Sequence, residues 1–290
     1  MAVLFFLLIY YYMRIADSHN DFLTYYKTRQ QKINYLYRLS YTDLKILNCV
    51  FWTTETKSPL KSLILNKKIL DKNKTKIKLL YSIEDIGFSN LKNIENFIEN
   101  KIDFCGLVWN YNNTLGGGAL DNGTITPLGK KIIRKLEENN ILIDTAHMNR
   151  KTFNSFYKIT TKPIYNSHSN IYDLCKHNRN LKDYQIKKII NSNGFLGLSF
   201  VKDFIKDGET NFTSLDVAKQ ISYFIKKYGN NNVGLGSDFF GTTKLPNNLK
   251  CYLDIKNLEN DLISLGISKD TINKIFYNNY YDFLLRVGKI

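Results

Sequence analysis

The sequence has 290 residues, of which 43% are hydrophobic and 23% charged; this is enough apolar material for a large core and excludes an intrinsically disordered chain. The formal net charge is +15, but lysine is scattered over the whole length and forms no basic patch, so we expect no nucleic-acid partner. The four cysteines have no paired spacing, which excludes a disulfide framework and a thiolate zinc site and indicates a reducing compartment.

Residues 1–12 are apolar and have the composition of a signal sequence or membrane anchor. They lack a positively charged start and a small-residue cleavage site, and they are too short to span a bilayer. We expect an extension upstream of a natural start at Met13, followed by one domain over residues 13–290. The expected protein is cytoplasmic, without membrane attachment; a secreted or anchored form is the alternative.

From residue 13 onward, short apolar runs alternate with amphipathic stretches. Helical spacing after a proline or a capping residue predicts helices at 127–136, 182–190 and 215–228. Strands are predicted at 14–17, 46–52, 77–83, 104–109, 141–145, 164–166, 195–200 and 233–237. Eight strands alternating with helices predict an α/β fold, a (β/α)8 TIM-type barrel in a single domain.

Acidic or histidine side chains follow five of these strands: His19, Asp21, Glu84, His147, His168 and Asp238. His19 and Asp21 are two residues apart at a strand end, so both point to the same face. The carboxyl ends of barrel strands meet at one rim, and these residues therefore predict a shared metal site. His177 lies in a polar stretch that we expect to be helical, and we exclude it from the site.

The spacing of these residues resembles a known family. From Met13 to the carboxyl end, the chain is similar to the renal (membrane) dipeptidases, zinc metallopeptidases among the amidohydrolase-like barrels. The blocks that carry the resemblance are DSHND (17–21), SIE (82–84), WNYNNTLGGG (109–118), TPLG (126–129), IDTAH (143–147), NSHSN (166–170), HNRNLKD (177–183) and GLGSD (234–238).

The resemblance implies two Zn²⁺ per chain. His19 and Asp21 would hold one ion, His147 and His168 the other, and Glu84 would bridge them. Imidazole nitrogen and carboxylate oxygen are both good zinc ligands. The implied reaction is hydrolysis of small dipeptides, L,L or L,D, by a metal-bridging hydroxide; a homodimer is one assembly that such an enzyme could form.

Further roles follow from the resemblance. Arg179 would receive the free C-terminal carboxylate of the dipeptide, unless it is a surface arginine at a helix end. Asp238 would act in catalysis with Glu84, moving the proton from attacking water to leaving amine; the alternative is that it orients a metal ligand. Trp109 and Asn110 are assigned to substrate binding.

The chain also departs from the family pattern. Trp109 stands where mammalian relatives have a histidine thought to polarise the substrate carbonyl. Gln220 replaces a histidine found in many relatives, and Asp85 replaces a glycine. Gly116–Gly118 are expected to form a flexible loop at the rim.

Two other functions remain open. A metal-dependent phosphoesterase or nuclease on a related barrel would fit the basic charge, although such proteins usually begin with His-x-His and this chain has His19-Asn-Asp21. A non-catalytic binding protein that retains the fold is disfavoured, because buried charged ligands without a metal are costly.

Overall fold

The eight apolar runs predicted as strands pair in chain order into a closed parallel barrel, with β1 beside β8. The computed structural model describes residues 13–53, 58–73, 75–208 and 211–290, and the predicted extension over residues 1–12 lies outside them. The strands are β1 (Ile15–Asn20), β2 (Leu44–Trp52), β3 (Lys78–Glu84), β4 (Phe104–Gly106), β5 (Leu142–Asp144), β6 (Tyr165–Asn166), β7 (Phe195–Leu198) and β8 (Val233–Leu235). The predicted single-domain barrel is therefore confirmed.

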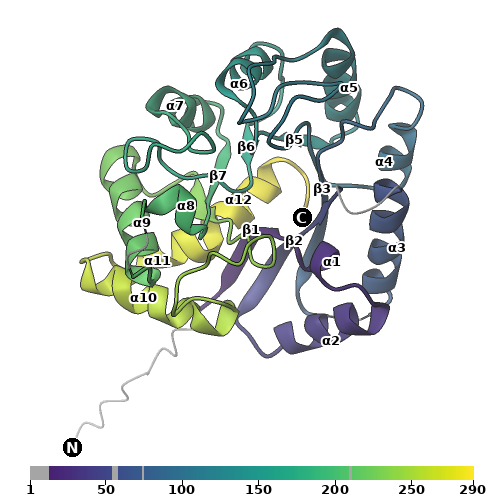
Figure 1. The fold of residues 1–290 in the computed structure, drawn as a ribbon. Coiled ribbons are helices and arrows are strands. Elements are labelled where there is room, and N and C mark those ends of the chain that lie inside the picture. Colours follow the sequence, from purple (N-terminus) through teal and green to yellow (C-terminus); the bar gives the residue numbers. More distant parts are fainter. Residues whose placement is uncertain (1–12, 54–57, 74, 209–210) are drawn as a thin grey trace, which may run out of the picture.

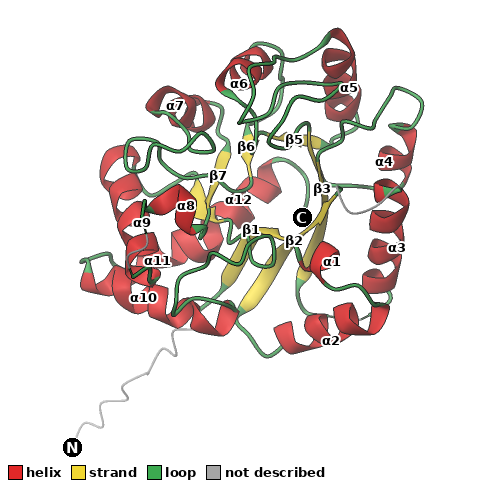
Figure 2. Ribbon diagram, viewed as in Figure 1, coloured by secondary structure: helices red, strands yellow, loops and turns green. Residues whose placement is uncertain are grey.

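Helices surround the barrel, and in Figures 1 and 2 most of them lie outside the central strands. They are α1 (Phe22–Tyr25), α2 (Arg29–Leu39), α3 (Pro59–Asp71), α4 (Glu95–Glu99), α5 (Pro127–Glu138), α6 (Arg150–Tyr157), α7 (Asp183–Asn191), α8 (Lys202–Ile205), α9 (Ser214–Tyr228), α10 (Ile255–Ser264), α11 (Lys269–Asn273) and α12 (Asn279–Arg286), with η1 (Tyr252–Asp254) and η2 (Lys274–Asn278). None of the helices in these described ranges is long and apolar enough to cross a membrane.

Local chemistry explains where the predicted helices begin. At α5 the Thr126 hydroxyl accepts a hydrogen bond from the Gly129 N–H, and Pro127 occupies the first turn, where its missing N–H is no loss. At α9 the Asp216 carboxylate accepts the Thr213 N–H at 3.0 Å. The three helices expected from spacing are present with ends shifted by one or two residues.

Helix α12 closes one end of the barrel, and it is visible through the centre of the ring in Figure 1. Its buried Tyr280, Phe283 and Leu284 pack against residues from the beginnings of seven strands: Ala16, Ile46, Leu80, Phe104, Leu142, Tyr165 and Phe195. The Phe283 and Tyr165 rings are stacked with centroids 5.6 Å apart. The amino-terminal end of the barrel is thus an apolar plug, and the opposite end is left for polar side chains.

A buried aspartate joins strand ends at the carboxyl-terminal end of the barrel. Asp17 in β1 accepts hydrogen bonds from the backbone N–H groups of His19 and Ser237, at 3.1 and 2.9 Å, and from the Tyr252 hydroxyl at 2.5 Å. The Asp238 N–H then donates to the His19 carbonyl at 3.2 Å. These bonds join the ends of β1 and β8 and bring His19 and Asp238 side by side.

The expectation of a flexible loop at Gly116–Gly118 is wrong. All three glycines are buried. A Cβ at Gly118 would lie 2.2 Å from the Trp109 carbonyl oxygen, and one at Gly117 would lie 2.5 Å from the Gly123 carbonyl. The glycines are needed because backbone packs directly on backbone here, and the segment is part of the wall behind Trp109.

The plug predicts a strong dependence of stability on α12. Replacing the fully buried Phe283 with alanine should lower the free energy of unfolding by about 3–5 kcal/mol, because the cavity left in the plug cannot collapse fully. Leu285→Ala on the same helix is the matched control, since Leu285 is 47% exposed and should change stability by less than about 0.5 kcal/mol. Urea unfolding at a fixed metal concentration measures both; equal losses would contradict the plug.

Candidate metal centre

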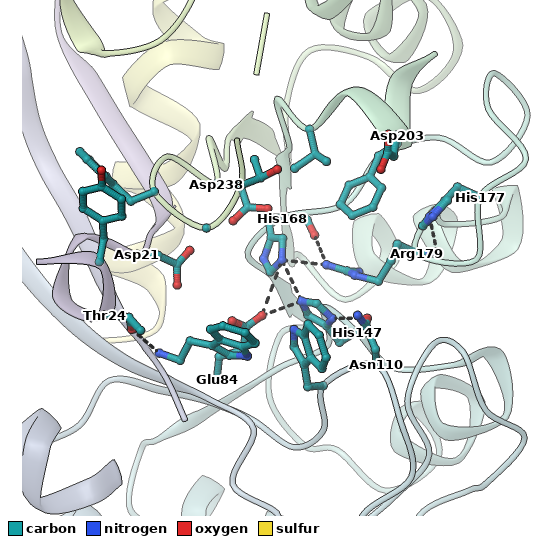
Figure 3. A pocket seen from close by; sticks show the side chains of 18 of the residues that line it. Asp21, Thr24, Glu84, Asn110, His147, His168, His177, Arg179, Asp203 and Asp238 are labelled. Carbon is teal, nitrogen blue, oxygen red and sulfur yellow. Dashed lines mark hydrogen bonds and ion pairs between the residues drawn. The ribbon is translucent and has the colours of Figure 1, made fainter. Parts of the chain in front are cut away.

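The six side chains predicted from strand ends gather at one rim. His19 belongs to β1 and Glu84 ends β3, while Asp21, His147, His168 and Asp238 follow β1, β5, β6 and β8. Five of them line a cavity of about 500 Å³, and the sixth, His19, is 1% exposed and lies beneath its floor. Figure 3 shows Asp21, Glu84, His147, His168 and Asp238 around this cavity. Its volume is within the range of small-molecule sites.

One half of the site consists of Glu84, His147 and His168. The His147 Nε2 atom lies 2.6 Å from Glu84 Oε1 and 3.0 Å from His168 Nε2. His168 Nε2 is 3.8 Å from the same carboxylate oxygen. Two imidazole nitrogens and one carboxylate oxygen therefore face a common point.

The other half consists of His19, Asp21 and Asp238. The His19 Nε2 atom lies 3.1 Å from Asp21 Oδ2 and 3.8 Å from Asp238 Oδ1. Ligand atoms of His19, Glu84 and His168 also lie within 4.8 Å of one another. Glu84 thus lies between the two halves, and Asp238 is close enough to His19 for both side chains to bind the same cation.

The backbone conformation around the site allows these charged side chains to lie close together. His147 and Asp238 adopt left-handed conformations, with φ of 66° and 59°, which are strained for residues other than glycine. A Cβ at Gly241 would lie 2.1 Å from Asp238 Oδ1 and 2.5 Å from Asp21 Oδ2. Gly241 is therefore required for the two carboxylates to fit, and the sequence alone gave no signal for it.

Two imidazoles that line the cavity are held in their neutral form. Burial and the charge of Arg179 lower the pKa of His147 to about 4. Burial, with the charges of His19 and Arg179, lowers the pKa of His168 well below its usual range. Both rings are neutral near pH 7, as metal ligands must be.

The pKa values of the buried carboxyl groups depend on the positive charges near them. Burial alone would raise the pKa of Glu84, but its contact with His147 and the positive charges of His19 and Arg179 lower it to about 2. Burial and the charges of Asp21 and Glu84 raise the pKa of Asp238 well above its usual range. Burial would lower the pKa of His19, but the carboxylates around it, above all Asp21, raise it to about 10. Positive charge is needed at this point.

The donor set fits a divalent cation. The Asp21 Oδ1 atom is buried and has no hydrogen-bond partner among the described residues, although a buried carboxylate oxygen is costly to leave unpaired. Imidazole nitrogens and carboxylate oxygens in one cluster are the donors that zinc and neighbouring first-row metals accept. The residues that could hold such ions are His19, Asp21, Glu84, His147, His168 and Asp238.

Arg179 lies in the cavity wall and not on the surface. It is 4% exposed, and its Nη2 atom is 2.7 Å from His168 Nε2 and donates to the His168 carbonyl at 3.1 Å. Its Nη1 donates to the Ser169 hydroxyl at 3.3 Å. Burial lowers the pKa of Arg179 to about 10, so the guanidinium stays charged at pH 7. A fixed positive charge therefore borders the metal cluster.

His177 was expected in a helix away from the site, and this expectation is wrong. It lies in the loop between β6 and α7 and lines the cavity. Its Nδ1 accepts the Arg179 backbone N–H at 3.2 Å, and its ring is 4.9 Å from that of Phe204. His177 shapes the loop that carries Arg179, and its ring does not join the cluster of the other three histidines.

Aromatic side chains form the remaining walls. Trp109 lines the cavity, with its ring 5.2 Å from Trp52 and 5.9 Å from His147. Asn110 also lines it, but its Oδ1 is 2.9 Å from His147 Nδ1 and holds that ring from behind. Trp52 ends β2, so the strand-end rule that selected Glu84 would have found it if applied to aromatic residues as well.

Comparison with known proteins relates this site to a family. The profile of the family described as membrane dipeptidase (peptidase family M19) matches residues 42–289. An uncharacterized protein in the pqqA 5′ region of Klebsiella pneumoniae is 30% identical over 209 residues, which cover 68% of this chain and 76% of that protein. Dipeptidase aclJ of Aspergillus oryzae is 28% identical over 152 residues, 52% of this chain but only 36% of the fungal protein.

A solved structure shares the fold. The chain is similar to a metallopeptidase from Rhodobacter sphaeroides liganded with a phosphinate mimic of the dipeptide L-Ala-D-Ala. The TM-score is 0.81 and the sequence identity 17%, with 95% of this chain and 99% of that chain covered.

The geometry predicts that two cavity histidines differ in their effect on metal binding. His147→Ala should weaken metal binding by more than the roughly 10- to 100-fold that loss of an outer hydrogen-bond partner causes, because it removes a nitrogen donor. His177→Ala is the matched control and should retain the wild-type metal content. Metal analysis after dialysis measures both variants; an unchanged metal content in His147→Ala would contradict the assignment.

Proposed function

Since this chain belongs to the membrane dipeptidase family and is a metallopeptidase of that type, we propose that it hydrolyses dipeptides that carry a free C-terminal carboxylate. The proposed site uses two zinc ions. The observation that supports the substrate class most strongly is the buried Arg179 guanidinium, whose Nη2 lies 2.7 Å from His168 Nε2.

The place of Arg179 favours very short substrates. A planar guanidinium binds a carboxylate through two parallel hydrogen bonds. One residue spans about 3.8 Å between successive Cα atoms, so an arginine that touches a metal ligand leaves room for one residue between the scissile bond and the carboxylate. A longer peptide would place its terminal carboxylate beyond this guanidinium.

Five carboxylate and imidazole groups would hold the cations. His19 and Asp21 would bind one ion and His147 and His168 the other, with Glu84 between them. When bound, such ions lower the pKa of water and stabilise negative charge on a carbonyl oxygen. The protein contributes the fixed geometry of these donors and a cavity with aromatic walls that limits access of bulk water.

Asp238 is proposed to handle the proton. Its carboxylate lines the cavity, and burial together with Asp21 and Glu84 raises its pKa. A carboxylate with a raised pKa can accept a proton from the attacking water at Oδ1 and release it to the nitrogen of the leaving amine. Glu84 would assist by holding its negative charge between the two halves of the site.

The stereochemical preference of the reaction is also a proposal. The Rhodobacter sphaeroides metallopeptidase was liganded with a mimic of L-Ala-D-Ala, which supports L,D-dipeptides as substrates; L,L-dipeptides are the alternative. Trp109 takes the place of a family histidine thought to polarise the substrate carbonyl. Stabilisation of that oxygen would therefore depend mainly on the cations.

Arg179→Ala is predicted to lower kcat/KM for L-Ala-D-Ala by at least about thirtyfold, the lower end of the 2–5 kcal/mol that loss of a buried charged partner costs. The wild type should strongly prefer the dipeptide to its C-terminal amide, and the variant should lose that preference. Arg150→Ala, outside the cavity lining, is the control for loss of a positive charge. Equal wild-type rates on acid and amide would contradict the proposal, and hydrolysis of a phosphodiester in place of dipeptides would replace it.

Asp238→Asn is predicted to lower kcat by about 10²- to 10⁴-fold with little change in KM. The amide cannot accept the proton, whereas the space it fills is nearly the same. Metal content should be measured on the same sample. A loss of bound metal in parallel with the loss of rate would instead make Asp238 a ligand or an orienter of His19.

A further inference from the structure

Two histidines from opposite halves of the metal centre share one hydroxyl group. The Ser167 Oγ atom lies 3.1 Å from His19 Nδ1 and 2.8 Å from His168 Nδ1. The two rings are in contact, with centroids 3.8 Å apart. Ser167 is fully buried between the end of β6 and His168, and it does not line the cavity.

This contact bears on the protonation pattern of both rings. A neutral imidazole carries one proton, and a ring whose Nε2 binds a cation must carry that proton on Nδ1. An oxygen placed at Nδ1 accepts the proton in a hydrogen bond and thereby selects this tautomer. His147 has its own acceptor, Asn110 Oδ1 at 2.9 Å, whereas the Nδ1 atoms of His19 and His168 both face the same serine.

The hydroxyl can accept from both rings when its own proton is directed to a third group. Ser167 contacts the buried Asp144 carboxylate through its backbone N–H, at 2.9 Å, and also through its side chain. A hydroxyl has one proton to donate and two lone pairs to accept with. If the proton goes to Asp144, both lone pairs face the two Nδ1–H groups, and each hydrogen-bonding position of the serine is satisfied.

The surrounding backbone fixes the serine in place. Its carbonyl oxygen accepts the Ser18 hydroxyl at 2.6 Å. A Cβ at either Gly197 or Gly236, in or beside the two following strands, would come within 2.0 Å of that same oxygen. Glycine at both positions lets the chain at β7 and β8 close on the Ser167 carbonyl, which fixes the backbone that carries the hydroxyl.

We propose that Ser167, oriented by Asp144, is a positioning residue shared by both halves of the metal centre, so that its loss weakens the binding of both cations together. The proposal rests on the proposed two-zinc site. It assigns to Ser167 no contact with substrate or with the ions.

Ser167→Ala tests this through metal affinity. Competition of Zn²⁺ between the metal-free protein and a chromophoric chelator should show both binding steps weakened by about 10- to 100-fold. Ser199→Ala is the control, because Ser199 is equally buried and its hydroxyl accepts a backbone N–H from Val201 without touching a histidine. Asp144→Asn, which keeps the shape of the side chain, should weaken both steps as well and guards against misfolding of the first variant.

A second readout needs no metal. In ¹⁵N-histidine-labelled, metal-free wild type, the Nδ1 proton of His168 should be hydrogen-bonded and protected from exchange with solvent, and in Ser167→Ala this protection should be lost. Arg179 donates to Nε2 in both proteins and keeps the tautomer the same, so the change in exchange reports the Ser167 contact itself. Wild-type affinity in Ser167→Ala for either ion would overturn the proposal. A wild-type chain that binds no zinc would refute the two-zinc site, and the ring nitrogens would then decide the role of Ser167 alone.

Discussion

The structure depends on the balance of charge in one small buried volume. Asp21, Glu84 and Asp238 place three carboxylates within a few ångströms of three imidazoles, and the Arg179 guanidinium lies beside them. Burial of such groups is unfavourable unless each is paired. The carboxylates around His19 raise its pKa to about 10 against the effect of burial, so the cluster favours positive charge at this point. Divalent cations would satisfy the same donors more completely.

The fold separates stability from chemistry at the two ends of the barrel. The plug formed by α12 supplies apolar packing at the amino-terminal end, where Phe283 and Tyr280 are buried. Hydrogen bonds fix the other end. The Asp17 contacts join β1 to β8, and the Ser167 hydroxyl contacts the His19 ring. Glycines at the rim, Gly241 among them, leave the space in which ionisable side chains can meet. The packing of α12 at the amino-terminal end stabilises the fold and offsets the backbone strain at the carboxyl-terminal rim.

Much of this arrangement could be predicted from the sequence, because it follows from periodicity. Strand-end residues such as His19 and Glu84 must share a rim once eight parallel strands close. Contacts that depend on three-dimensional packing could not be predicted. Ser167 and His19 are 148 residues apart, and no spacing reveals that one hydroxyl reaches two rings. His177 was misplaced because its polar neighbours resemble a helix surface, whereas the loop is held by its bond to Arg179.

The most direct test of the account is to locate zinc by anomalous scattering in crystals of the protein grown with Zn²⁺. The account predicts two peaks at the carboxyl end of the barrel, one bound by His19 and Asp21, the other by His147 and His168, with Glu84 between them. A single peak, or peaks away from these side chains, would contradict it.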